Sequence, residues 1–135
     1  MHAAVWSRRK PSAPGISRAV QSSPGKEFEN MFNAKVNTRF FGLLGNPVGQ
    51  SAAPFMHNSV YQKLGLDMLY VPLELEMESL ETVVRTMQLF NYAGTGVTMP
   101  FKTQVHKYID GLADSARYTE VVNTIVIGKD GRKIG

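Results

Sequence analysis

From residue 36 onward, short apolar runs alternate with stretches of helical periodicity, and this alternation restricts the possible folds more than any other feature. Apolar runs of this length, bounded by glycine, proline or other turn residues, are typical of strands. We expect strands at residues 40–44, 68–75, 92–99 and 121–127, a hairpin turn at 128–131 and the start of a return strand at 132–135. Pro72 indicates that the second strand is an edge strand or carries a bulge.

Helical periodicity fills the spaces between these strands. Met56, Val60 and Leu64 recur on one face of a helix that begins near Ser51 and stops at Gly65. Acidic residues lead into the next helix, where they suit its N-terminus: Glu74, Glu76, Glu78 and Glu81. Further helices are expected at residues 80–90, 101–109 and 114–118. This order predicts an α/β fold, a three-layer sandwich with a mostly parallel sheet.

The net charge of +4 comes from the N-terminal segment and not from the body of the chain. The first 26 residues contain no acid and carry five basic residues, namely Arg8, Arg9, Lys10, Arg18 and Lys26. Prolines and glycines also interrupt any helix there. We therefore expect residues 1–35 to be a disordered basic extension and residues 36–135 to be one folded domain. Charge in the body is nearly balanced, so we expect no nucleic-acid partner.

Composition excludes several classes of site. Cysteine is absent and histidine occurs three times, so neither a disulfide scaffold nor a metal centre is expected. No run of 18 apolar residues occurs, so we expect no membrane partner and a cytoplasmic protein.

Three segments that follow predicted strands, or lie within one, carry polar side chains suited to binding. Ser51 comes after the turn Gly45-Asn46-Pro47, Thr98 and Lys102 stand at the end of the third strand, and Asn123 lies in the Val-Val-Asn-Thr segment. Taken singly, each residue type also has a purely structural role. Ser51 could cap a helix, Thr98 could favour the strand, Lys102 could be a surface charge and Asn123 could stabilise a turn. Together, at the carboxyl ends of strands, they would suit a small, hydroxyl-rich anion. The Gly94-Thr-Gly96 stretch lacks the third glycine of a dinucleotide loop, so we expect no nucleotide site there.

The stretches FGLLGNPVGQSAAPFMHN, GTGVTMPFK and VVNTIV, in this order and spacing, resemble the N-terminal substrate-binding domain of the shikimate dehydrogenase family. The similarity runs from about residue 39 to 135. It implies an enzyme that reduces 3-dehydroshikimate to shikimate with NADP, towards chorismate and aromatic amino acids. The cofactor would be bound by a C-terminal Rossmann domain that this chain lacks, so the chain would bind no cofactor and be inactive alone. Its ending inside a predicted strand suggests truncation.

The resemblance also implies roles for individual residues. Lys102 matches the catalytic lysine, Ser51 a serine that binds the substrate carboxylate, and Thr98 and Asn123 residues that bind ring hydroxyls. Tyr70 lies where some members place a tyrosine beside the carboxylate. The carboxylate partner of the lysine would come after Gly135.

Two departures from the family pattern leave alternatives open. Ala53 replaces a second serine or threonine of the carboxylate site, and Gly96 replaces the usual asparagine. The Gly-Thr-Gly-Val-Thr-Met-Pro variant resembles the quinate/shikimate dehydrogenase branch, which accepts quinate and can use NAD. A stand-alone, non-catalytic binding module for a cyclic polyol carboxylate, or a fragment without function, are further alternatives.

Overall fold

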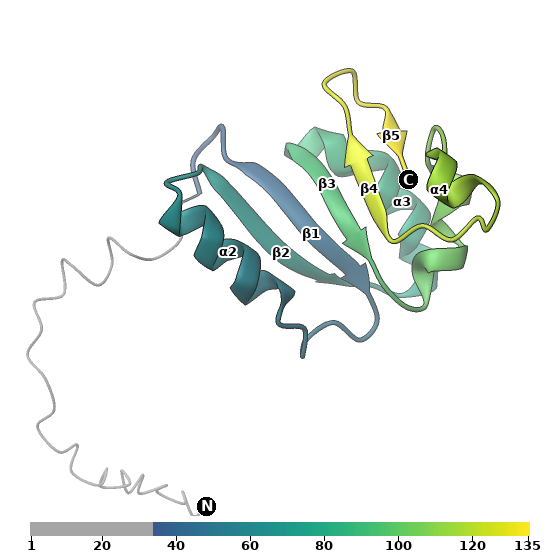
Figure 1. Ribbon diagram of the computed structural model, residues 1–135, viewed down its shortest axis with the longest axis horizontal. Helices are drawn as coiled ribbons and strands as arrows, with labels where there is room; N and C mark the ends of the chain where they lie inside the picture. Colours follow the sequence, from purple (N-terminus) through teal and green to yellow (C-terminus); the bar gives the residue numbers. More distant parts are fainter. Residues whose placement is uncertain (1–33) are drawn as a thin grey trace, which may run out of the picture. The chain divides into compact units, whose positions relative to one another are not determined.

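A computed structural model describes residues 34–135, so nearly all of the expected N-terminal extension lies outside the described residues (Figure 1). Over this range, five strands form one sheet in the order β2-β1-β3-β4-β5. The strands are β1 (Arg39–Gly45), β2 (Met68–Glu74), β3 (Tyr92–Val97), β4 (Thr124–Ile127) and β5 (Lys133–Ile134). The α/β class expected from the sequence is confirmed.

The direction of β4 makes the sheet mixed, where a mostly parallel one was expected. β1 pairs in parallel with β2 and with β3, whereas β4 runs antiparallel to β3 and β5 antiparallel to β4. A parallel connection needs a crossover that returns the chain to the amino end of the sheet. Here the chain leaves β3 through short helical turns, and the Val97 nitrogen donates a hydrogen bond to the Asn123 oxygen. β4 therefore begins at the end where β3 finishes.

The helical segments are shorter and more irregular than the periodicity predicts. Residues 80–90 form α3 followed by a 3₁₀ turn, and residues 101–109 form two 3₁₀ turns in place of one helix. The segments are α2 (Ala53–Lys63), η1 (Met77–Ser79), α3 (Leu80–Thr86), η2 (Met87–Phe90), η3 (Phe101–Thr103), η4 (Val105–Tyr108) and α4 (Asp114–Arg117).

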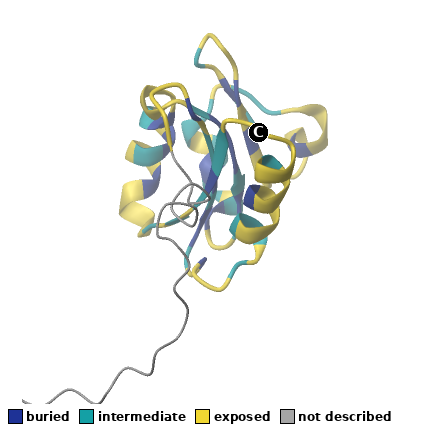
Figure 2. Cartoon of the chain, turned by 90° about the vertical axis from the view of Figure 1, so that its left-hand side faces the viewer, coloured by how far each residue is buried: buried dark blue, intermediate teal, exposed yellow. Residues whose placement is uncertain are grey.

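The helical segments lie on both faces of the sheet, which gives the expected three layers (Figures 1 and 2). One face carries the main core, in which strand residues such as Leu44 and Ile125 pack with Leu80, Val84 and Phe101, all fully buried. Burying side chains of this size is the chief source of stability in a domain. The opposite face is covered at the β1 and β2 side by α2 and stays open over β3.

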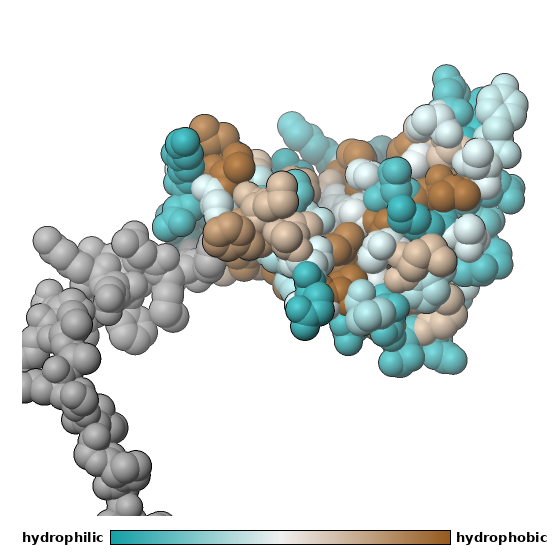
Figure 3. Space-filling view, turned by 60° about the horizontal axis from the view of Figure 1, so that its bottom comes forward, coloured by the Kyte–Doolittle hydropathy of each residue, from teal (hydrophilic) through white to brown (hydrophobic). Residues whose placement is uncertain are grey.

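The apolar stripe of α2 does not face the sheet, contrary to the usual meaning of such a pattern. Met56, Val60 and Leu64 keep 63%, 51% and 64% of their surface exposed. Brown and tan surface on the α2 side of the molecule is visible in Figure 3. The helix packs through a different face, on which the Tyr61 ring lies 6.0 Å from the Phe41 ring. Since α2 lies along the outer strand, only a narrow part of its surface meets the sheet.

Candidate functional site

The loop between β1 and α2 brings Ser51 to the carboxyl end of the sheet, and Glu74 holds this loop in place. The Glu74 Oε2 atom accepts hydrogen bonds from the backbone nitrogens of Val48, at 2.8 Å, and Gly49, at 3.3 Å. The Ser51 nitrogen donates to the Val48 oxygen at 3.0 Å, and its half-buried side-chain oxygen accepts from the Ala53 nitrogen at 3.2 Å. Glu74, expected to cap a helix, instead fixes the turn that presents Ser51.

The segment that follows β3 is tied to the end of β1. The Thr98 nitrogen donates to the Leu44 oxygen at 2.8 Å, and the Asn46 nitrogen donates to the Met99 oxygen at 3.0 Å. A side chain at Gly45 would overlap the Thr98 methyl group, so the glycine permits the close approach of the two segments. Thr98 therefore lies beside the start of the loop that carries Ser51.

Backbone hydrogen bonds also bring Lys102 and Asn123 to this end. The Val97 nitrogen donates to the Asn123 oxygen at 2.8 Å, and the Val122 nitrogen donates to the Lys102 oxygen at 2.9 Å. Lys102 is half-buried within η3, and Asn123 is exposed just before β4. Two segments that lie about twenty residues apart in the sequence thus meet at the carboxyl end of β3.

Tyr70 lies on the edge strand β2, on the face of the sheet that α2 covers at this side, and it is buried there. Its ring stacks on His57, with ring centroids 4.3 Å apart and planes at 8°. The Asn58 side chain binds the Tyr70 backbone at both polar groups, with Nδ2 donating to the oxygen at 2.9 Å and Oδ1 accepting from the nitrogen at 2.8 Å. Burial, with a smaller contribution from the charge of Tyr61, raises the pKa of Tyr70 above its ordinary value of 10.0.

The segments that carry Ser51, Thr98, Lys102 and Asn123 lie at one end of the sheet, and Tyr70 lies within the edge strand β2. Among residues 34–135, no hydrogen bond joins the side chains of these five residues to one another. Ala53, at the first position of α2, contributes only a methyl group. The roles of Glu74 and Asn58 were not predicted from the sequence, because both act through contacts between elements that are distant in the chain.

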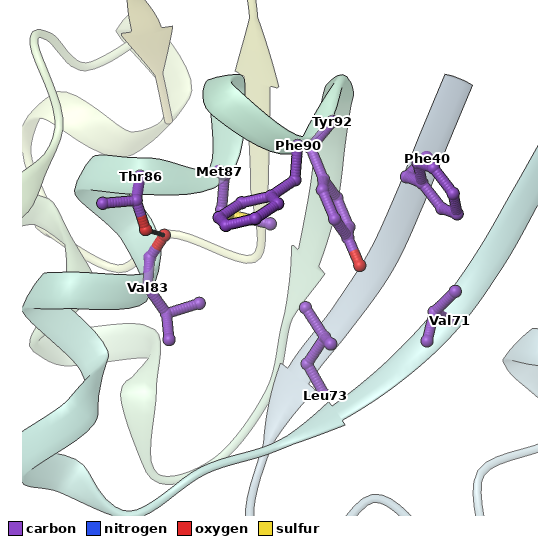
Figure 4. A pocket seen from close by; sticks show the side chains of 8 residues that line it. All are labelled: Phe40, Val71, Leu73, Val83, Thr86, Met87, Phe90 and Tyr92. Atoms are coloured by element: carbon purple, nitrogen blue, oxygen red, sulfur yellow. Dashed lines mark hydrogen bonds between the residues drawn. The ribbon is translucent and has the colours of Figure 1, made fainter. Parts of the chain in front are cut away.

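A separate cavity of about 500 Å³ lies on the core face of the sheet, against α3 and η2 (Figure 4). Its lining is almost wholly apolar: Phe40, Val71, Leu73, Val83, Thr86, Met87, Phe90 and Tyr92. The Thr86 hydroxyl is already used, since it donates to the Thr82 oxygen at 2.7 Å. None of the six candidate residues lines this cavity, and it offers no cation to an anionic ligand. The open end of the sheet is therefore the better candidate.

Metal-ligating clusters and membrane-spanning helices are both absent from residues 34–135. No group of three acidic or histidine side chains in this part of the chain could hold a metal ion. None of its helices has the length and apolar character needed to cross a membrane.

Comparison with known proteins gives consistent matches. A family model described as the shikimate dehydrogenase substrate binding domain matches residues 43–125. A shikimate dehydrogenase (NADP(+)) of Rubrobacter xylanophilus is 41% identical over 98 residues, which are 73% of this chain and 34% of that protein.

Solved structures agree. A shikimate 5-dehydrogenase from Listeria monocytogenes, in complex with shikimate and NAD, is 39% identical in sequence and matches with a TM-score of 0.70. The match covers 75% of this chain and 35% of that protein. A shikimate dehydrogenase in complex with NADP+ is 35% identical with a TM-score of 0.72, and the match covers 76% of this chain and 36% of that protein. The chain thus spans about a third of the length of these relatives. Because the family model covers more than half of the chain and the fold agrees, this chain belongs to the shikimate dehydrogenase family.

Proposed function

We propose that this chain is the substrate-holding part of an enzyme that reduces 3-dehydroshikimate to shikimate, towards chorismate and the aromatic amino acids. One observation carries the proposal beyond family membership. Backbone hydrogen bonds gather the segments of Thr98, Lys102 and Asn123 at the sheet end where the Ser51 loop also lies. A crevice at the carboxyl ends of strands is the usual ligand site of an open α/β sheet.

The substrate is a small ring that carries a carboxylate and hydroxyls, and each polar group has a proposed partner. Ser51 and Tyr70 donate hydrogen bonds to the carboxylate, and Ala53 leaves that site with one donor fewer than a serine would provide. Thr98 and Asn123 bind ring hydroxyls, since a hydroxyl and a carboxamide can both donate and accept. Hydrogen bonds to a charged group contribute about 1.5–3 kcal/mol each, so this set can select a carboxylate ligand.

Lys102 is the proposed catalytic residue. Reduction of a ring ketone leaves negative charge on its oxygen, and the lysine ammonium both stabilises this charge and delivers a proton to it. A positioned proton donor contributes roughly 10²–10⁴ in rate. In the opposite direction the neutral amine accepts the proton from the ring hydroxyl.

The described residues do not fit a dinucleotide cofactor. Gly94 and Gly96 lie inside β3, and a side chain at Gly94 would meet the Ile125 oxygen at 2.7 Å. Gly94 permits the close approach of β4, whereas a phosphate loop needs glycines between a strand and the start of a helix. We therefore propose that NADP, or NAD as the alternative, is held by a Rossmann domain outside this chain, and that the chain alone shows no turnover with 3-dehydroshikimate and NADPH.

Calorimetric titration of the 135-residue chain with shikimate, quinate and 3-dehydroshikimate tests the proposal. We expect at least one of these ring acids to bind, and Ser51→Ala and Thr98→Val each to weaken binding about tenfold. Ser59→Ala and Thr103→Val are matched controls at exposed positions and should leave the affinity unchanged. Quinate binding far more tightly than shikimate would favour the quinate branch. No binding of any of the three would contradict the proposed substrate class.

A further inference from the structure

The Tyr70 side chain reaches across the sheet to β3. In the register of the sheet, Tyr70 pairs with Phe41 of β1, which in turn pairs with Gly94 of β3. Its hydroxyl nevertheless lies next to Gly96, two residues further along β3. Stacking on His57 fixes the ring, and the ring leans along the strand direction, as strand side chains commonly do.

Gly96 leaves the space that this hydroxyl needs. A β-carbon built at Gly96 would lie 3.2 Å from the Tyr70 hydroxyl oxygen and 3.2 Å from Leu43 Cδ1. Contacts this short force the neighbouring atom to move, and a larger side chain would require a larger displacement. The Tyr70 ring has little freedom to yield elsewhere, because Asn58 holds its backbone and His57 covers one side of it.

We propose that Gly96 is a positioning residue, whose missing side chain admits the Tyr70 hydroxyl to the open face of the sheet, where it donates a hydrogen bond to the substrate carboxylate. This inference rests on the proposed function. Thr98, the proposed partner of a ring hydroxyl, follows β3 directly and comes two residues after Gly96. The Tyr70 hydroxyl and Thr98 would thus bind different groups of the same small ring.

The absence of a protein partner for the Tyr70 hydroxyl supports its proposed hydrogen bond to the substrate carboxylate. Among residues 34–135 the Tyr70 hydroxyl forms no hydrogen bond, and the residue as a whole is 8% exposed. A phenol hydroxyl without a protein partner can donate to a carboxylate ligand, because the new hydrogen bond replaces only a bond to water.

A double-mutant cycle on the 135-residue chain tests the inference, with the shikimate dissociation constant as the readout. We expect Gly96→Val and Tyr70→Phe each to raise this constant about tenfold, and Gly96→Ala to raise it less. The double variant Gly96→Val, Tyr70→Phe should bind as Tyr70→Phe alone does, since the hydroxyl that the introduced valine would displace is already gone. An equal loss from Gly96→Val in both backgrounds would assign its effect to Leu43 and overturn the inference.

A second measurement needs no ligand. In an alkaline titration followed by the tyrosine ring carbons in nuclear magnetic resonance, Gly96→Val and Gly96→Ala should lower the pKa of Tyr70 towards 10, because the displaced hydroxyl becomes more solvated. Gly111→Ala is the matched control, since its new β-carbon would also lie 3.2 Å from a side-chain tip, that of Ile134 on β5 at the opposite sheet edge.

The two readouts separate this inference from the proposed function. An unchanged Tyr70 titration in both Gly96 variants would overturn the inference whether or not shikimate binds. Failure of the unaltered chain to bind shikimate would count against the proposed function, while the titration would still decide whether Gly96 positions the hydroxyl.

Discussion

Asn58 shows how a single polar side chain can determine the way a helix packs. It is the one residue of α2 that is buried, and it satisfies both backbone polar groups that Tyr70 turns away from β1. A carboxamide offers one donor and one acceptor side by side, so it binds the outer strand as a neighbouring strand would. Its removal would leave a buried N–H and C=O without partners.

We predict that Asn58→Leu lowers the free energy of unfolding by about 2–4 kcal/mol, because two buried backbone groups lose their hydrogen bonds while the side-chain volume stays similar. Urea denaturation of the 135-residue chain measures this. Gln62→Leu, at an exposed position of the same helix, should change stability by less than about 0.5 kcal/mol. Equal effects of the two variants would mean that the hydrogen bonds of Asn58 contribute little.

At the scale of elements, Glu74 connects the end of β2 to the loop after β1. Its carboxylate accepts from two successive backbone N–H groups, and the Asn46 side chain adds a hydrogen bond to the Leu75 oxygen at 3.0 Å. The loop that presents Ser51 is therefore held from β2 in addition to its bonds with α2 and with the segment after β3. Its order should depend on a residue that is about 25 positions away.

We predict that Glu74→Ala increases the hydrogen-exchange rates of the Val48 and Gly49 amides about tenfold or more, since both lose their acceptor, while core amides of β1 keep their protection. Glu78→Ala, an exposed carboxylate on η1, is the control. Unchanged exchange at Val48 and Gly49 in Glu74→Ala would show that the loop is held by other contacts.

The strands could be predicted because apolar runs bounded by turn residues are local signals. Pro72 indicated an edge strand, and β2 does lie at the edge of the sheet. The packing face of α2 could not be predicted from Met56, Val60 and Leu64, since two hydrogen bonds of Asn58 outweigh the apolar stripe. The direction of β4 was also missed, because the order of elements along the chain leaves strand direction open. For the candidate site, the sequence predicts only that the polar segments follow strands. The contact of Glu74 with the loop after β1 depends on how β2 lies beside β1, which no local pattern encodes.

At the scale of the whole molecule, buried or half-buried tyrosines lie on both faces of the sheet. Burial raises the pKa values of Tyr61, Tyr70 and Tyr92 above 10.0, with Tyr61 also acting on Tyr70. A group with a raised pKa in the folded state holds its proton more tightly there than in the unfolded chain. Its contribution to stability is complete below pH 10 and is lost as the pH rises through the folded-state value.

We therefore predict that the free energy of unfolding is level between pH 8 and about pH 9.5 and falls above pH 10. Urea denaturation at pH 8, 10 and 11 measures the loss, and Tyr92→Phe should reduce it because Phe has no proton to release. Tyr118→Phe, at a position 93% exposed, should leave the loss unchanged. Equal alkaline profiles for Tyr92→Phe and the unaltered chain would contradict this assignment.

The paired bonds from Val97 to Asn123 and from Val122 to Lys102 have an evolutionary consequence. They fasten both ends of the stretch between residues 103 and 121, in which Val105 and Ala116 are also buried in the core and Gly111 pairs with Ile134 of β5. Among related proteins, insertions and deletions should therefore be confined to the exposed positions 117–121, while the intervals from 97 to 102 and from 122 to 124 keep a constant length.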